Sequence, residues 1–225
     1  MSFIAIIIVM SLIGGWVTTK MKRRMQLYST IPVQSGWTGA QTAQAMLAAN
    51  HVNDVQVVRG EGFLTDHYHP KNKVISLSPS VYDGMSVAAT SVAAHECGHA
   101  VQHHEGYGFL SLRTAMVPLV KVASRVQQVL LIAALLMYNS FPGLMIFLVG
   151  AFVITTLFAV LTLPVEFDAS RRALNWLDQS GAVDAETYKR SEDALKWAAM
   201  TYVAQALSAF VILLYFGYNF ISRRN

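Results

Sequence analysis

The chain has 225 residues, of which 54% are hydrophobic and 13% charged, with a formal net charge of +4. Soluble domains carry about 25% charged residues, so this composition excludes an ordinary soluble domain and indicates a membrane protein. The single cysteine excludes an intramolecular disulfide framework. A positive net charge alone does not indicate a nucleic-acid partner, and we expect none.

The first apolar segment covers residues 1–19, contains no charged residue and is followed at once by KMKRR. An apolar run of about 18 residues or more is long enough to cross a bilayer as a helix. A cleaved signal peptide would carry its positive charge before the apolar run and small residues at a cleavage site after it. We therefore predict an uncleaved transmembrane helix at residues 1–19.

Three further apolar runs predict transmembrane helices at residues 117–138, 144–163 and 202–220. The second of these carries Lys121 and Arg125 in its first half, so we expect it to begin at the interface and to enter lipid from about Val126. The sequence NSFPG that follows predicts a tight turn between the second and third spans, since Pro and Gly break helices.

The basic residues predict the orientation of these helices. All Lys and Arg except Arg223 and Arg224 lie within residues 20–125 or 164–200. Cytoplasmic segments are enriched in Lys and Arg, so both regions are predicted to face the cytoplasm. Four complete spans would leave the two C-terminal arginines outside, and a last helix that is re-entrant or lies along the surface is the alternative.

Residues 20–116 are predicted to form a small cytoplasmic α+β region. The sequence favours a short helix within residues 35–52 that starts at Thr or Gly, a small sheet that includes the alternating strand Val74 to Ser78, and a helix from Ser86 to about His104. Residues 164–200 are predicted to form a second cytoplasmic segment, whose helix begins at Pro164.

The sequence HECGH, residues 95–99, fits the pattern H-E-x-x-H. Residues four apart share one face of a helix, so His95 and His99 can both bind one Zn²⁺. Glu96 lies beside that face, where it can accept a proton from water and pass it to a leaving amine. A helix with surface histidines is the alternative for so short a motif. We predict one zinc ion per chain.

A catalytic zinc site needs a third protein ligand. His103 lies eight residues after His95, about 12 Å along the helix, which is too far for one ion. Glu105 has the position of the last ligand in an extended H-E-x-x-H pattern, but Gln102 stands where that pattern requires glycine. Glu166, in LPVEFDASRRAL, is the strongest candidate, because a carboxylate beside an apolar span is costly to bury without a partner.

An alternative role for Glu166 is a favourable charge at a helix N-terminus, and Asp168 could serve in the same way.

A peptidase needs a hydrogen-bond donor for the developing oxyanion or for the substrate, and we expect this donor in the polar segment TDHYHP or at Tyr107. The candidates are His67, Tyr68, His69 and Tyr107. Cys97 is expected to be a small buried packing residue.

The segments AAHECGHAVQH and LPVEFDASRRAL together resemble the YugP-like family of bacterial membrane zinc peptidases. SGWTGAQTA, LTDHYHPKNKVISLSPSVY and TYVAQAL also resemble that family, so the likeness covers nearly the whole chain. A more distant resemblance links the chain to the HtpX and prenyl-protein peptidases. The resemblance implies a gluzincin arrangement, in which His95, His99 and Glu166 are the zinc ligands and Glu96 is the catalytic base.

The resemblance also implies features around the ligands. An edge strand runs above the H-E-x-x-H helix in such peptidases and can pair with an extended substrate, and VISLS is the candidate for that strand, with a purely structural strand as the alternative. The distant relatives often carry Asp four residues after the ligand Glu, where this chain has Ser170. Ser170 or Asp168 is expected to supply the hydrogen bond that orients a zinc-binding histidine.

These observations predict a mainly α-helical membrane protein with about four transmembrane helices and a small α+β, zincin-like catalytic domain. The predicted function is a zinc metalloendopeptidase that cleaves membrane-associated or misfolded proteins at the cytoplasmic face of the cell membrane. A catalytically inactive zinc-binding scaffold or adaptor is the alternative. It is disfavoured because structural zinc sites usually have four protein ligands, often thiolates. A transporter is disfavoured because the clean spans lack charges. The sequence defines no oligomeric state.

Overall fold

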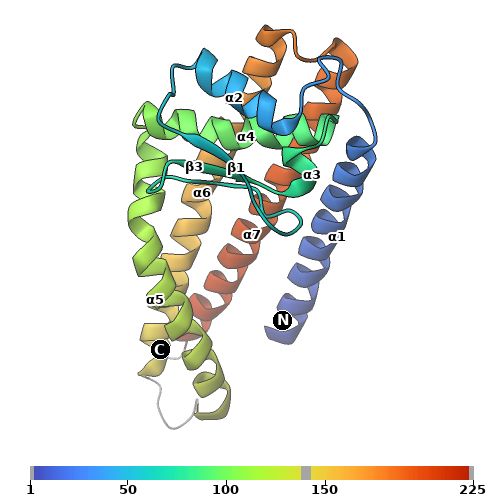
Figure 1. The fold of residues 1–225 in the computed structure, drawn as a ribbon. Coiled ribbons are helices and arrows are strands. Elements are labelled where there is room, and N and C mark those ends of the chain that lie inside the picture. The colour runs from blue at the N-terminus through green and yellow to red at the C-terminus, as the bar shows by residue number, and fades with distance from the viewer. Residues whose placement is uncertain (1–2, 138–142, 223–225) are drawn as a thin grey trace.

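The computed structural model describes residues 3–137 and 143–222 and is mainly helical, with one small sheet. Four long helices of this part of the chain run alongside one another: α1 (Phe3–Ser29), α5 (Gly108–Met137), α6 (Leu144–Ser180) and α7 (Ala185–Ser222). A layer lies across one end of them, and both described chain ends lie at the other end (Figure 1). The layer comprises α2 (Gly39–Ala49), β1 (Gln56–Arg59), β2 (His67–His69), β3 (Val74–Leu77), α3 (Pro79–Tyr82) and α4 (Val87–His104).

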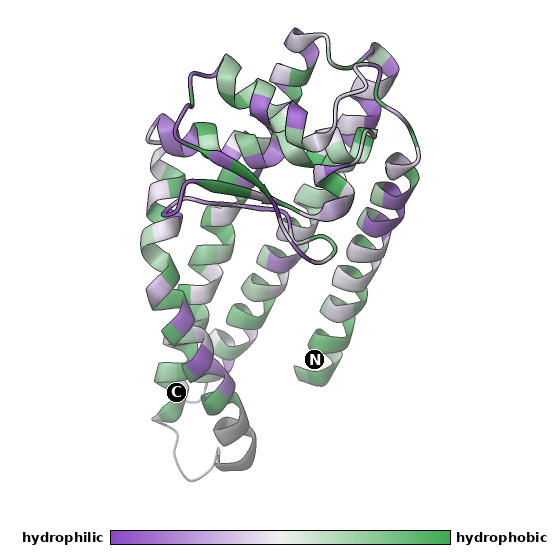
Figure 2. Ribbon diagram, viewed as in Figure 1, coloured by the Kyte–Doolittle hydropathy of each residue, from purple (hydrophilic) through white to green (hydrophobic). Residues whose placement is uncertain are grey.

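Three of the described helices, α1, α6 and α7, are long and apolar enough to cross a membrane. They contain the described parts of the predicted spans 1–19, 144–163 and 202–220, and Figure 2 shows hydrophobic residues along them. Within the described residues α5 is not among these candidates, so the span at 117–138 stays a prediction. Residues 1–2, Tyr138, most of the predicted turn at 139–143 and the C-terminal arginines lie outside the described residues.

The sequence predicts that a helix begins at Pro164. This prediction is wrong, because α6 runs through Pro164. A proline removes one helical hydrogen bond, yet this helix continues for four further turns. It ends at Gly181, whose φ of 66° gives the left-handed cap that favours glycine. Glu166 therefore lies in the middle of the same continuous helix that carries the predicted third span.

Two predicted helices of the layer that lies across the long helices (hereafter the upper layer) are confirmed, and local caps explain where they begin. Helix α2 starts after Thr38, whose side chain accepts from the backbone of Gln41 while the Gln41 side chain accepts from the backbone of Thr38. Helix α4 starts after Ser86, whose side chain accepts from the backbone N–H of Ala89. Such caps satisfy N–H groups that have no partner within the helix.

The three strands are ordered β1-β3-β2, with β3 parallel to β1 and antiparallel to β2. The predicted strand at Val74 to Ser78 is confirmed as β3, but its expected position at a sheet edge is wrong, because β3 has a partner on each side. The edge strand beside α4 is β2, whose Tyr68 backbone N–H reaches the side chain of Glu96 on that helix.

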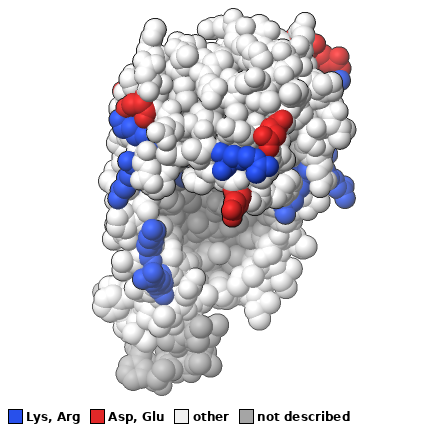
Figure 3. All heavy atoms as spheres, viewed as in Figure 1, with Lys and Arg blue, Asp and Glu red and all other residues white. Residues whose placement is uncertain are grey.

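The main core lies between the sheet, α2, α4 and the second half of α6. Ile75 and Leu77 of β3 and Leu177 of α6 are fully buried there, while α4 contributes small side chains such as Ala93 and Cys97. Small residues let the backbones of α4 and α6 approach each other closely. Figure 3 shows the surface hollowed below the sheet, with basic side chains of α5 beside the hollow.

Candidate active site

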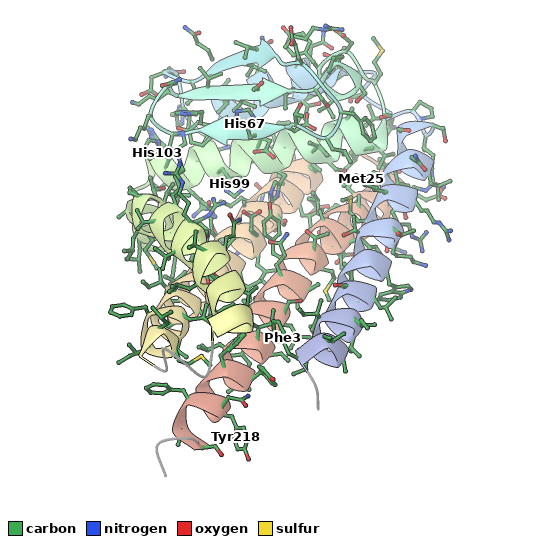
Figure 4. All side chains as sticks on the ribbon, turned by 90° about the horizontal axis from the view of Figure 1, so that it is seen from below. Phe3, Met25, His67, His99, His103 and Tyr218 are labelled. Atoms are coloured by element: carbon green, nitrogen blue, oxygen red, sulfur yellow. The ribbon has the colours of Figure 1, made fainter. Side chains whose placement is uncertain are left out.

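The candidate site lies where α4 crosses α6. Gly98, inside the HECGH motif, is the point of close contact: a Cβ there would lie 2.5 Å from the carbonyl oxygen of Ala169. Only glycine permits this approach without displacing one of the helices. The crossing brings His95 and His99 on α4 opposite Glu166 on α6. Figure 4, seen from below, shows His99 beside the long helices and His103 toward the end of α4 near α5.

The three expected ligands converge on one point. Nε2 of His95 lies 3.3 Å and Nε2 of His99 lies 3.5 Å from Oε2 of Glu166. These three residues form a group of potential ligand atoms that all lie within 4.8 Å of one another. Their side chains are largely buried, and that of Glu166 is only 3% exposed.

This arrangement fits zinc. Bonds of about 2.0–2.1 Å in a tetrahedral site separate the ligand atoms by about 3.3 Å, close to the two separations between the histidines and Oε2 of Glu166. Oε2 of Glu166 is buried and makes no hydrogen bond of good geometry within the described residues. A buried carboxylate oxygen that faces two imidazole nitrogens would be strongly stabilised by a cation between them.

The imidazole of His99 is oriented by Gln102, one turn later on α4. Nε2 of the fully buried Gln102 donates to the carbonyl oxygen of Val165 at 2.8 Å and to Oδ2 of Asp168 at 2.9 Å. Both amide hydrogens are thereby used, so Oε1 of Gln102 accepts from Nδ1 of His99 at 3.0 Å. Nε2 of a neutral His99 then carries its lone pair toward Glu166, as a metal ligand requires.

The partner of His95 is Ser170, one of the two residues expected to orient a histidine. Oγ of Ser170 lies 3.1 Å from Nδ1 of His95. Asp168, the other one, reaches His99 only through Gln102, and it also pairs with Arg171 and Arg172. His95 is thus held by a hydroxyl of α6, and His99 by an amide of α4 that is itself bonded to α6, rather than directly by a carboxylate.

Glu96 points toward the sheet edge. Its side chain accepts a hydrogen bond from the backbone N–H of Tyr68 at 2.9 Å, and the residue is 8% exposed. The Tyr68 hydroxyl lies 2.8 Å from Nδ1 of His103. Burial, with a smaller effect from Asp54, raises the pKa of Tyr68 to about 12, so this phenol stays protonated at neutral pH.

The other candidates from the polar segment have local partners. Nδ1 of His67 lies 2.7 Å from the carbonyl oxygen of Thr65, and Nδ1 of His69 accepts from the backbone of Asn72. The ring of Tyr107 packs against Phe109. Within the described residues, the contacts of His67, His69 and Tyr107 are with these neighbours and not with the three candidate ligands. Their roles in catalysis therefore remain predictions.

Two residues of the motif region are placed away from the ligand group. Glu105, the alternative third ligand, is exposed and pairs with Arg172 at 2.7 Å. Cys97 is fully buried in the core, as expected, and burial raises the pKa of its thiol well above the ordinary value. A protonated thiol buried on another face of α4 is not a zinc ligand.

Besides the orienting role of Gln102, sequence reasoning missed two polar residues near the ligands. Nη2 of Arg113, on α5, lies 3.8 Å from Oε1 of Glu166. Tyr202, on α7, interacts electrostatically with both Glu96 and Glu166. The sequence holds a signal for the first only, a charged residue just before an apolar run, since Tyr202 is simply the first residue of the predicted span at 202–220.

The electrostatics of the group depend on Glu166. Burial alone lowers the pKa of His99, but the nearby carboxylate of Glu166 outweighs it, and the net pKa is raised. Without a metal, the histidine therefore retains a proton more readily than usual. A metal ion that binds Nε2 must displace this proton.

Comparisons with known proteins place the chain in a family. Residues 3–220 match the family described as "Putative neutral zinc metallopeptidase". The chain belongs to this family. It is also 40% identical over 226 residues to the "Putative membrane protease YugP" of Bacillus subtilis (strain 168), an alignment that covers 100% of this chain and 99% of that protein. No solved structure matches.

Membership of this family confirms the resemblance to the YugP-like zinc peptidases that the sequence motifs show. The chain is a zinc metallopeptidase by family and a homologue of a membrane protease, which implies zinc as cofactor and protein or peptide as substrate. The group formed by His95, His99 and Glu166 is a site in this chain that could hold the metal.

Proposed function

We propose that the protein is a zinc-dependent membrane endopeptidase in which His95, His99 and Glu166 hold one zinc ion and Glu96 is the general base. The observation that carries the proposal is the convergence of three buried ligand atoms from two crossing helices, with Oε2 of Glu166 lacking a good hydrogen bond. Glu96 follows the first ligand directly and is absent from the ligand group, which leaves its carboxylate available for proton transfer.

The residues of the chain then divide the hydrolysis between them. Zinc, when bound, supplies a Lewis acid and makes water nucleophilic at neutral pH. Glu96 accepts a proton from the attacking water as the water oxygen bonds to the carbonyl carbon of the peptide. Glu96 then delivers this proton to the amide nitrogen, so that the C–N bond breaks into a carboxylic acid and an amine. Gln102 and Ser170 hold the two imidazoles during these steps.

Strand β2 is the proposed place for the substrate backbone. Its inner edge is paired with β3, whereas the Tyr68 N–H points away from β3 and toward Glu96. An extended peptide that adds to this edge would lie beside the catalytic base. This assignment replaces VISLS, which cannot accept a further strand because both its edges are already paired.

We place the site at the cytoplasmic membrane surface of a multi-pass protein. Glu166 lies three residues after the predicted third span, on the same continuous helix. Apolar helices α1, α6 and α7 extend away from the upper layer, and the surface below the sheet is hollowed (Figure 3). A site at this depth favours membrane-associated or misfolded proteins over free peptides as substrates.

The test uses the purified full-length protein in lipid vesicles with two substrates, one peptide sequence anchored to the vesicle by a transmembrane helix and the same sequence free in solution. The wild type is expected to cleave the anchored peptide faster, to lose activity with a chelator and to regain it with zinc. Glu96→Gln should bind zinc without cleaving. Zinc binding by the wild type with no cleavage of either substrate would instead support a scaffold. Equal cleavage of both substrates would contradict the preference for membrane-associated proteins.

A further inference from the structure

Arg113 is a charged residue that the proposed mechanism does not yet use. It lies in the second turn of α5, which begins at Gly108, and reaches across to α6, where its Nη2 is 3.8 Å from Oε1 of Glu166. Oε1 is the carboxylate oxygen on the other side from the two imidazoles. The side chain of Arg113 is 30% exposed, so it is only partly covered by the rest of the protein.

The guanidinium of Arg113 has N–H donors that are not used in hydrogen bonds to Glu166. It carries five N–H groups in a planar fork, but 3.8 Å is too long for a hydrogen bond to Glu166. Its Nε atom is buried and has no hydrogen-bond partner within the described residues. Native proteins rarely bury a donor without a partner, and the exceptions often occur at functional sites. An acceptor that arrives with the substrate would satisfy it.

We propose that Arg113 is a catalytic residue, which donates hydrogen bonds to the carbonyl oxygen of the scissile peptide bond. This inference rests on the proposed peptidase function. As water oxygen bonds to the carbonyl carbon, the C=O π-electron pair moves onto the carbonyl oxygen, and a positive donor beside it stabilises the new negative charge. The pair returns when the C–N bond breaks, with the amine leaving after protonation by Glu96. Arg113 itself exchanges no proton.

Tyr202 is the competing donor, since its hydroxyl lies within electrostatic range of Glu96, Glu166 and Arg113. The choice of Arg113 follows from charge and from its buried, unsatisfied Nε. A cation stabilises a developing oxyanion more strongly than a neutral phenol does, and a hydrogen bond to a charged donor is stronger than one between neutral groups. Arg113 also comes from α5, which carries no other residue assigned to the site.

The experiment compares the wild type with Arg113→Gln, Arg113→Lys and Tyr202→Phe, and with Arg125→Gln as the matched control. Arg125 is an exposed arginine on the same helix. Four quantities are measured for each protein in vesicles: bound zinc, kcat, KM, and the dissociation constant of a phosphinic peptide, whose tetrahedral oxyanion mimics the transition state.

Arg113→Gln is expected to keep its zinc and its KM, while kcat falls about 100-fold or more and the phosphinic peptide binds weaker by a similar factor. Arg113→Lys should recover part of both losses, and Arg125→Gln should match the wild type. Loss of zinc in Arg113→Gln would overturn the proposal, because Arg113 would then only support Glu166. An unchanged kcat in Arg113→Gln, or a large loss confined to Tyr202→Phe, would also overturn it. A wild type without zinc-dependent cleavage would instead refute the peptidase function.

Discussion

Gly98 of α4 and Ala169 of α6 are in direct backbone contact, and this contact sets the distance between the two helices that carry the candidate ligands. A Cβ at position 98 would lie 2.5 Å from the carbonyl oxygen of Ala169 and 3.0 Å from its Cα. Since both partners of this contact are backbone atoms, no side-chain rotation can relieve it. The glycine inside HECGH thus has a structural purpose, separate from the histidines on either side.

Gly98→Ala is expected to move α4 away from α6 and to weaken zinc binding at least tenfold, with overpacking that costs about 1–3 kcal/mol of stability. The matched control is Gly150→Ala on α6, where an added Cβ meets nothing within 4 Å. Zinc titration of the purified proteins checks the prediction. If Gly98→Ala binds zinc as tightly as Gly150→Ala does, the close crossing is not needed for the site.

Gln102→Leu should lower zinc affinity about 10–100-fold, because it removes the acceptor of His99 and leaves Asp168 without one of its donors. Gln102→Glu keeps an acceptor for His99 but places a second carboxylate beside Asp168. We expect this variant to bind zinc better than Gln102→Leu while unfolding at a lower temperature than the wild type. Gln128→Leu, an exposed glutamine on α5, serves as control. Wild-type zinc affinity in Gln102→Leu would rule out the orienting role.

Zinc affinity should depend on pH through His99. Glu166 raises the pKa of this buried histidine against the opposing effect of burial, so the metal-free protein holds a proton there that zinc must displace. Affinity should therefore fall as pH falls, by about tenfold per unit below this pKa, and level off above it. Calorimetry in buffers of different ionisation enthalpy, from about pH 6 to pH 8, measures the released proton. Zinc binding with no proton release in this range would contradict the assigned state of His99.

Sequence alone predicts much of the site. The helix around HECGH follows from the motif and from Ser86 at its start, both of which are local signals. The choice of Glu166 as third ligand rested on a carboxylate beside an apolar run and on the family resemblance, and the structure brings this residue to His95 and His99.

The parts that the sequence did not predict depend on non-local packing. The order of three short strands is not encoded by their alternation, so the prediction that β3 is an edge strand fails, and β2 is the edge strand beside α4. Proline favours the first position of a helix, so the sequence predicts a helix start at Pro164, but α6 runs through this residue. Arg113 and Gln102 lie beside partners more than fifty residues away, a relation that no local pattern reveals.

The orientation in the membrane can be tested at Lys71, an exposed residue in the turn between β2 and β3. Cys97, the native cysteine, is fully buried, so Lys71→Cys would introduce the reactive thiol. A membrane-impermeant maleimide should label this variant only after the cells are permeabilised, because the upper layer is predicted to be cytoplasmic. Labelling of intact cells would reverse the proposed topology.

The most direct test of the central claim is the zinc content of purified wild type, Glu166→Ala, Glu105→Ala and Glu96→Gln, measured by elemental analysis. We predict one zinc per chain in the wild type, in Glu105→Ala and in Glu96→Gln, and loss of zinc in Glu166→Ala. This result would separate the ligand on α6 from the base on α4. Zinc retained in Glu166→Ala but lost in Glu105→Ala, or a wild type that binds no zinc after reloading, would contradict the site described above.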